Sequence, residues 1–297
     1  MRTLLLIGPG DVARRALPQL LLQWQVVALC RRPETAKAVR AAGAEAVEGD
    51  LDSPETLAPL AGLAEAVLYT APPPAFGTTD PRLRKCLSAL TKGKRIAQHW
   101  VYISTTGVYG DAGGAWVDEN TPVRPHSARA QRRVDAEVAL ATLYRDTGSA
   151  VTVLRAPGIY AEDRLPLERL TNGTPLFLAE EDSWSNHIHA DDLALSCSVA
   201  LAQTRAGFEL FNACDSAPLK MGEWFDKLAD ATGLARAPRL PRQTVQAQVS
   251  PMLWSFLAES RRVSNQRLRD VLGVQLRYPT VDDFLNHHFP SGGHSAG

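Results

Sequence analysis

The sequence predicts an α/β protein: a doubly wound, parallel β-sheet with helices on both faces, together with a smaller α+β lobe. Short apolar runs of strand length alternate with helical patterns through the first 155 residues, and a glycine turn directly follows the first run. Turn signals become denser from residue 156. We therefore expect residues 1–155 to form the sheet domain. Residues 156–290 should mainly form the second lobe, with the segment at about 187–213 packing back against the sheet domain. The tail at 291–297 is expected to be disordered.

Each expected element follows from a local pattern. Strands are buried-type apolar runs, and helices carry apolar residues at helical spacing, two of them ended by Gly43 and Gly93. The strands expected in the core are 3–7, 25–30, 45–47, 65–70, 100–103 and 151–154. The helices expected between them are 11–23, 33–42, 78–93 and 128–144. A helix at 193–203, a short strand at 208–213 and a helix at 221–232 follow.

Composition excludes several classes of partner. The 32 basic and 32 acidic side chains cancel, so no net charge attracts nucleic acid or an anionic membrane. The four cysteines form no CxxC pair, which favours a reducing compartment, and no apolar run reaches the roughly 18 residues of a membrane span. We expect a cytoplasmic monomer or homodimer that acts on a small molecule, without nucleic-acid or membrane binding.

The first thirty residues predict a dinucleotide site. The apolar run 3–7 leads into GPGDVA at 8–13, a GxGxxA match between a strand and a helix, and a second strand follows. Gly8 permits the tight turn, Gly10 lets the backbone approach a pyrophosphate, and Ala13 lets the helix pack against the strand. This is the Rossmann-type arrangement, with the helix N-terminus facing the anion.

The end of the second strand bears on the choice of cofactor. A fold that prefers NAD usually has a carboxylate there, whereas arginine accommodates the 2′-phosphate of NADP. Cys30, Arg31 and Arg32 occupy this position, and guanidinium groups bind phosphate in a planar, charge-assisted way. We therefore predict NADP, with NAD as an alternative. The other interpretation is that two arginines on a surface turn are simply solvated.

Two further turns lie at the ligand edge of the expected sheet. Asp50 and Leu51 follow the third strand, where Asp50 or Asp52 is expected to contact the adenine region or to cap the next helix. A proline-rich loop follows the fourth strand and is expected to wall the nicotinamide-ribose region. The cofactor residues expected up to this point are Gly8, Gly10, Asp11, Val12, Ala13, Arg31, Arg32, Asp50, Leu51, Thr70, Ala71 and Pro72.

Five segments in order resemble one family. They are GPGDVA at 8–13, GDL at 49–51, STTGVYG at 104–110, LRAPGIY at 154–160 and HIHADDLA at 187–194. The ordered set resembles the extended short-chain dehydrogenase/reductase superfamily, the group of NAD(P)-dependent epimerases and dehydratases, and in particular its atypical members. The resemblance covers about residues 1–280. It implies a nicotinamide cofactor, with Pro157 beside it, and an oxidoreductase or isomerase activity.

The resemblance also shows a departure from the family. It implies that Thr105 holds the substrate oxygen, and that a tyrosine and a lysine four residues apart on the next helix transfer the proton. Here Arg129 and Arg133 stand at those two positions, and none of the six tyrosines has a lysine four residues later. Arg133 can still hydrogen-bond a cofactor ribose, but arginine keeps its proton, so Arg129 is no general base.

Other side chains are weaker candidates for the missing chemistry. His126 is one candidate because histidine is a common proton-transfer residue, although a lone histidine in a loop is usually only exposed. Tyr109 and Tyr160 are expected near the substrate cleft. Arg164 in the second lobe is expected to bind an anionic group of the substrate, with a solvated surface arginine as the alternative.

The segment HIHADD at 187–192 allows a metal interpretation, because residues two apart on a strand share a face and histidine with carboxylate suits zinc or iron. The resemblance instead implies a short strand entering a helix that an aspartate caps. We therefore predict no metal site at this segment.

Two functions follow from these patterns. The first is an NADP-binding, epimerase/dehydratase-like oxidoreductase that acts on a sugar-like or other hydroxyl-bearing molecule by transient hydride transfer. The second is a non-catalytic NADP-binding sensor or regulatory protein, which Arg129 and Arg133 at the positions of the family pair would suit.

Overall fold

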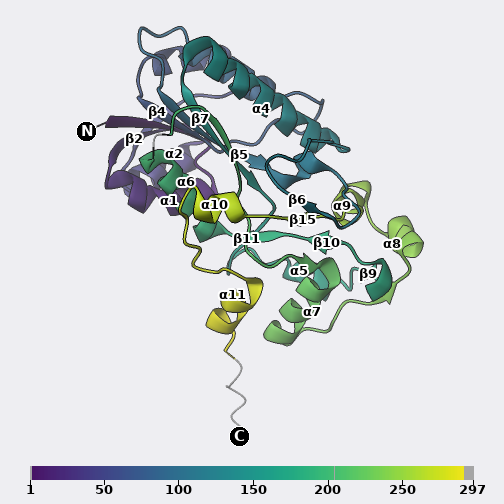
Figure 1. Ribbon diagram of the computed structural model, residues 1–297. Helices are drawn as coiled ribbons and strands as arrows, with labels where there is room; N and C mark the ends of the chain where they lie inside the picture. The colour runs from purple at the N-terminus through teal and green to yellow at the C-terminus, as the bar shows by residue number, and fades with distance from the viewer. Residues whose placement is uncertain (1, 204, 291–297) are drawn as a thin grey trace, which may run out of the picture.

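A seven-stranded, fully parallel sheet forms the centre of the protein (Figure 1). The computed structural model describes residues 2–203 and 205–290, so the tail at 291–297 lies outside the described residues. The strand order is β12-β7-β5-β4-β1-β2-β3. The strands are β1 Arg2–Ile7, β2 Trp24–Cys30, β3 Glu45–Glu48, β4 Ala66–Tyr69, β5 His99–Thr105, β7 Ala150–Ala156 and β12 Phe208–Asn212. The predicted fold class is confirmed.

Helices cover both faces of this sheet because successive strand residues point to opposite sides. In β1, Leu4 and Leu6 join one apolar core, and Leu5 and Ile7 join the other. The first core is covered by α1 Asp11–Leu21, α2 Pro33–Ala41, α6 Ala190–Ala202 and α10 Gln266–Asp270. The second is covered by the 3₁₀ segment η1 Pro54–Leu60, α3 Pro81–Leu90 and α4 Ala128–Thr147.

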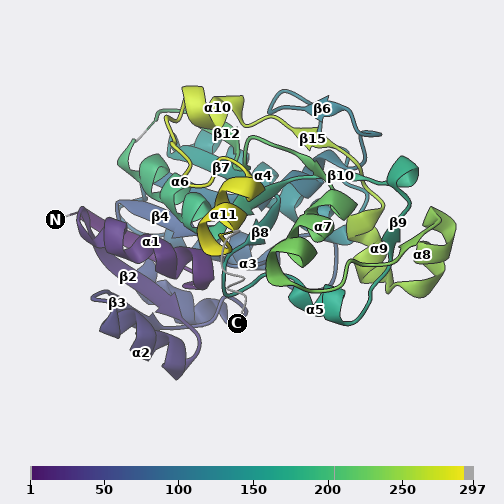
Figure 2. The same cartoon turned by 90° about the horizontal axis from the view of Figure 1, so that it is seen from below.

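A second lobe lies on the side of the molecule away from the N-terminus (Figure 2). Its own core gathers large aromatic side chains, among them Phe177, Trp224, Phe225 and Phe284. The lobe and its connections contain η2 Thr106–Tyr109, β6 Trp116–Val117, β8 Gly158–Tyr160, α5 Leu167–Thr171, β9 Leu176–Phe177, η3 Ala179–Glu181, β10 Trp184–Ser185, β11 His187–His189, β13 Leu219–Lys220, α7 Met221–Thr232, β14 Arg239–Leu240, α8 Arg242–Gln248, α9 Pro251–Leu257, β15 Arg262–Val263 and α11 Val281–His288. No helix in the described ranges is both long and apolar enough to cross a membrane.

We expected an aspartate to cap the start of α6, and this expectation was wrong. The N-cap residue is His189, whose Nδ1 accepts a hydrogen bond of 3.2 Å from the Asp191 N–H. The Asp192 carboxylate instead accepts from the backbone N–H groups of Arg277 (2.6 Å) and Tyr278 (3.0 Å). Asp192 therefore fastens the C-terminal segment to the sheet layer, while β12 adds a strand beside β7.

A buried ion pair joins several of these elements. Arg155 of β7 forms two hydrogen bonds with Glu137 of α4, at 3.1 and 2.6 Å, and Ser104 of β5 donates to the same carboxylate at 2.6 Å. Arg155 also donates to the Tyr109 hydroxyl, which in turn donates to Asn212 of β12 at 2.7 Å. The Arg155 and Glu137 side chains are only 4% and 9% exposed. Each charged group is therefore satisfied by the other and by neutral neighbours.

Replacing Glu137 with Ala tests this network. The substitution leaves the Arg155 guanidinium buried without its carboxylate, so we expect the free energy of unfolding to fall by about 3–5 kcal/mol, measured by urea denaturation. Arg236→Ala is the control, because Arg236 pairs with Asp230 at the surface and its loss should leave the denaturation midpoint unchanged. Equal midpoints for Glu137→Ala and wild type would show that the buried pair does not hold these elements together.

Candidate functional site

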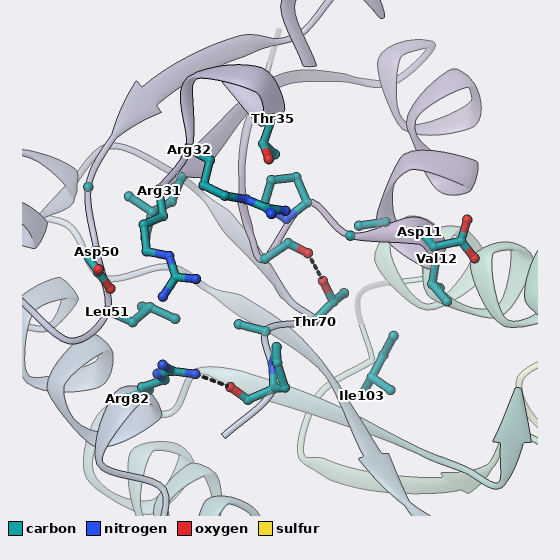
Figure 3. Close-up of a pocket in the computed structure, with 18 of the residues that line it drawn as sticks. Asp11, Val12, Arg31, Arg32, Thr35, Asp50, Leu51, Thr70, Arg82 and Ile103 are labelled. Atoms are coloured by element: carbon teal, nitrogen blue, oxygen red, sulfur yellow. Dashed lines mark hydrogen bonds between the residues drawn. The ribbon is translucent and has the colours of Figure 1, made fainter. Parts of the chain in front are cut away.

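A cleft of about 430 Å³ opens over the carboxyl ends of the strands (Figure 3). It lies where the strand order reverses, between β1 and β4, which is the position at which ligands bind in doubly wound sheets. The residues that line it are Gly8, Pro9, Gly10, Asp11, Val12, Ala13, Leu29, Arg31, Arg32, Thr35, Gly49, Asp50, Leu51, Thr70, Ala71, Pro72, Arg82, Ile103, Arg133, Ile159 and Arg164. Thirteen of the fourteen predicted cofactor residues are in this lining, and the exception is Pro157.

The glycine turn shapes the middle of the cleft. Gly8 has φ +85°, and a Cβ there would lie 2.5 Å from the backbone nitrogen of Ala71, so only glycine fits. The hydroxyl of Thr70 donates to the Gly8 carbonyl, which joins the same two strand ends (Figure 3). A Cβ on Gly10 would meet only the Gly8 oxygen, at 3.8 Å, so the protein leaves the space beside Gly10 open.

The N-terminus of α1 faces this space. Gly10 is its N-cap residue and supplies no side chain to satisfy the first N–H groups, and Asp11, Val12 and Ala13 of the first turn all line the cleft. Free N–H groups and the positive end of the helix dipole favour an anion at this point. The turn therefore has the geometry and the charge of a phosphate cradle.

One end of the cleft is strongly basic. The exposed side chains of Arg31 and Arg32 extend into it from the end of β2 (Figure 3). Within the described residues, no carboxylate lies within ion-pair distance of either group. Arg82 of α3 lies at the same end but is occupied, since it forms hydrogen bonds of 2.9 and 2.6 Å with Asp52. That hydrogen bonding to Arg82 holds the pKa of Asp52 below its usual value.

The aspartates after β3 serve the turn itself. Asp50 Oδ1 accepts from the Asp52 N–H at 2.9 Å, and the N-cap of η1 is Ser53, which makes no side-chain cap. The expectation that Asp50 or Asp52 caps this segment was therefore wrong. Asp50 nevertheless lines the cleft beside Leu51.

Arg133, from α4, enters the other end of the cleft. Its Nη1 donates to the Tyr102 hydroxyl at 2.8 Å and to the Ile103 carbonyl at 3.0 Å, which fixes the guanidinium group against β5. Burial raises the pKa of Tyr102 to about 12, although Arg133 opposes the shift, so the phenol keeps its proton. Thr105 is half-buried two residues after Ile103, and its Oγ1 accepts from the Gly107 N–H at 3.1 Å. Thr105 itself lies just outside the cleft lining.

Arg129 and His126 lie outside the cleft lining as well. The Arg129 guanidinium stacks 3.7 Å from the ring centroid of Phe256 in α9, and burial lowers the pKa of Arg129. The His126 side chain is exposed, with its ring near Gly110. The structure therefore separates Arg129 from Arg133, although the two are one helical turn apart.

Tyr109 and Tyr160, the two tyrosines expected near a substrate cleft, do not line the cleft at the glycine turn. Tyr109 is 3% exposed, and Arg155 and Asn212 engage its hydroxyl. Tyr160 is 2% exposed and packs edge-on against His189 at 5.4 Å between ring centroids. Burial raises the pKa values of both phenols, that of Tyr109 to about 12. Neither phenol faces the cleft at the glycine turn, because both side chains point into cores.

The two histidines of the candidate metal segment lie in the same core. His187 is fully enclosed, and burial lowers its pKa to about 4, while His189 caps α6. Within residues 2–203 and 205–290, no group of three His, Cys, Asp or Glu side chains is placed to hold a metal ion.

The sequence reasoning missed several lining residues. Thr35 lies in the first turn of α2. Arg82 lies in the first turn of α3, so far along the chain from Gly8 and Gly10 that the sequence alone does not show that it is near them in space. Leu29 and Ile103 lie inside strands that the sequence predicts, and Gly49 lies two positions after the strand expected at 45–47. Ile159 lies in β8, five positions after the strand expected at 151–154, so extending strand ends by one or two positions would have added Gly49 but not Ile159.

The fold and the cleft together define a dinucleotide-binding α/β protein. A comparison with known families gives the particular group: the NAD(P)H-binding family matches residues 8–203, and the chain belongs to that family. The family match supports a nicotinamide cofactor.

The chain is similar to three known proteins, one by sequence and two by structure. A 4-hydroxy-2-methyl-3-oxo-4-farnesyl-3,4-dihydroquinoline-1-oxide ketoreductase from Stigmatella aurantiaca is 26% identical over 291 residues, covering 90% of this chain and 85% of the relative. A conserved protein of unknown function from Silicibacter pomeroyi is 30% identical, with a TM-score of 0.77 over 96% of this chain and 97% of its own. A dTDP-glucose 4,6-dehydratase from Streptomyces venezuelae, solved with NAD, shares the fold at 19% identity, with a TM-score of 0.76 over 96% and 95%.

The two glycines of the turn predict different phenotypes. Gly8→Ala forces a Cβ against Ala71 and should lower the melting temperature. Gly10→Ala has room in the protein and an ordinary φ of −79°, so its melting temperature should match wild type. The nicotinamide dinucleotide, tested as both NADH and NADPH, should bind about tenfold more weakly in isothermal titration calorimetry. Unchanged affinity for both dinucleotides in Gly10→Ala would remove this turn from the binding site.

Proposed function

We propose that the protein is an NADP(H)-dependent oxidoreductase that interconverts a carbonyl and an alcohol on a hydroxyl-bearing small molecule. The observation that carries this proposal is the pair of guanidinium groups, Arg31 and Arg32, without carboxylate partners in the described chain, at the end of β2 in a cleft that also contains the glycine turn. A 2′-phosphate is the anion that this end of a dinucleotide cleft would receive.

In this proposal the cofactor lies along the length of the cleft. Arg31 and Arg32 would hold the 2′-phosphate, Asp50 and Leu51 would border the adenine, and the turn at Gly10 with the first N–H groups of α1 would hold the diphosphate. Thr70, Ala71 and Pro72 would border the nicotinamide ribose, to which Arg133 can donate from a fixed position. When bound, the nicotinamide supplies or accepts a hydride.

The residues of the chain position the substrate oxygen in this proposal. The Thr105 hydroxyl accepts from Gly107, and its own proton has no acceptor within the described residues, so it is free to donate to a carbonyl oxygen. Arg133 adds a fixed positive charge on the same side of the sheet. The ketoreductase relative supports a carbonyl substrate, and the dehydratase fold supports a sugar-like one. Tyr109, Tyr160 and His126 take no part in this proposal.

A non-catalytic NADP(H) sensor is the second candidate. It is favoured by Arg129, which stands where the family has its tyrosine and lies under the ring of Phe256 instead of facing the cleft. A screen of simple ketones and nucleotide sugars for NADPH oxidation separates the two candidates. Turnover of any of these substrates supports the enzyme, and tight NADPH binding without turnover across the screen supports the sensor.

Arg31→Ala and Arg32→Ala test the cofactor preference. If the two guanidinium groups recognise the 2′-phosphate, each variant should bind NADPH about tenfold to a hundredfold more weakly and leave NADH affinity unchanged. Fluorescence titration of both cofactors measures this, and Arg236→Ala at the surface is the control. Equal affinities for NADPH and NADH in wild type and in both variants would show that the arginines do not recognise the 2′-phosphate.

Thr105→Val tests the role of the hydroxyl. The variant keeps the branched shape of the side chain but cannot donate, so kcat should fall about a hundredfold with the NADPH dissociation constant unchanged. Thr105→Ser retains the hydroxyl and should recover most of the rate, which separates loss of the donor from a local structural change. Full activity in Thr105→Val would exclude the hydroxyl from the reaction.

A further inference from the structure

An ion pair crosses the mouth of the cleft at its phosphate cradle. Arg164, which follows β8, places Nη1 3.1 Å from Oδ2 of Asp11, the first residue of α1. Both residues line the cleft, together with Gly8 and Gly10. The pair therefore brings the chain segment 161–164 over the point where the helix N-terminus favours an anion.

A second arginine anchors this segment independently. Arg15 of α1 forms ion pairs with Asp11 at 3.0 Å, with Asp163 at 2.8 Å and with Asp191 at the start of α6 at 2.9 Å. Its side chain is 16% exposed, whereas that of Arg164 is 41% exposed. The segment thus stays fastened to α1 and α6 through Arg15, and Arg164 can exchange its partner without releasing the segment.

The partner of Arg164 is a carboxylate at a site suited to phosphate. Partial burial raises the pKa of Asp11, but hydrogen bonds from Arg15 and Arg164 outweigh it and hold the pKa below its usual value. Asp11 is therefore ionised at neutral pH and would repel an incoming diphosphate. Arg15 alone can continue to neutralise Asp11 when Arg164 turns away.

We propose that Arg164 binds the diphosphate of the cofactor, and that Asp11 holds this guanidinium in place until the cofactor arrives. This assignment rests on the proposed use of the cleft for NADP(H). It also replaces the sequence prediction that Arg164 binds the substrate, because Arg164 lies with the glycine turn in the cofactor cleft. Arginine suits the exchange, since its planar fork matches both carboxylate and phosphate oxygens.

Substitutions on the two sides of the pair should have opposite effects. Arg164→Ala removes a diphosphate ligand, so NADPH should bind about tenfold more weakly in isothermal titration calorimetry. Asp11→Asn removes the competitor, so NADPH should bind several-fold more tightly. In the double variant the gain from Asp11→Asn should shrink, because no guanidinium is left to release. If the pair were only structural, both single variants would break the same contact and shift affinity in the same direction, which would overturn the proposal.

Adenosine 2′-phosphate serves as a probe without a diphosphate. Arg164→Ala should leave its affinity unchanged, whereas Arg31→Ala should weaken both this probe and NADPH. Equal losses for probe and NADPH in Arg164→Ala would overturn the assignment to the diphosphate. Arg164→Lys should retain part of the NADPH affinity, and melting temperatures equal to wild type exclude unfolding as the cause.

The controls separate this proposal from the proposed function. Wild-type protein that binds neither NADPH nor NADH contradicts the cofactor assignment as a whole. Protein that binds NADPH and responds to Arg31→Ala, but not to Arg164→Ala, contradicts only the role of Arg164. If wild type prefers NADH, the same comparison of Arg164→Ala with Asp11→Asn is made with NADH, since that cofactor has the same diphosphate.

Discussion

The close approach of Gly8 to Ala71 is the constraint on which the cleft depends. Gly8 directly follows β1, and Ala71 lies two residues after β4; these are the neighbouring strands at which the sheet reverses its order of winding. Because Gly8 has no Cβ, the backbones meet at van der Waals distance, and the Thr70 hydroxyl closes the contact on the Gly8 carbonyl. The contact turns the chain sharply, so α1 begins with its free N–H groups directed at the space over the strand ends. A larger residue would part the strands and misdirect the helix.

The arginines that line the cleft differ in whether a carboxylate of the protein pairs with them. Arg31 and Arg32 have no carboxylate at ion-pair distance in the described chain, so a ligand can use their full charge. Arg82 and Arg164 already hold Asp52 and Asp11. A paired arginine costs an arriving phosphate the energy of separating the pair, and an unpaired one costs only desolvation. The cleft should therefore attract an anion most strongly at the end of β2, and in our proposal Arg164 exchanges Asp11 for the diphosphate.

The sequence was sufficient for features that depend on chain direction and glycine geometry. Gly10 and Arg31 line the cleft because parallel strands deliver their carboxyl ends to one edge whatever packs around them. Arg133 comes from α4, and only the family resemblance, not a strand end, led us to expect it there. The direction in which the Tyr109 side chain points could not be predicted from chain direction or glycine geometry. Its hydroxyl partner, Asn212, lies 103 positions away in the chain, and β12 brings it close only when the sheet is complete. The His189 cap escaped prediction because an aspartate is the commoner helix cap and two lie beside it.

The arginines of α4 limit the chemistry available in the cleft. A guanidinium keeps its proton, so neither Arg129 nor Arg133 can alternate between acid and base as a tyrosine does. Arg133 is held by Tyr102 and Ile103, which makes it a fixed charge. No histidine or tyrosine belongs to the lining formed by the described residues. Catalysis here would thus rest on orientation and electrostatic stabilisation of a developing oxyanion, with the proton supplied by water or by the substrate's own hydroxyl.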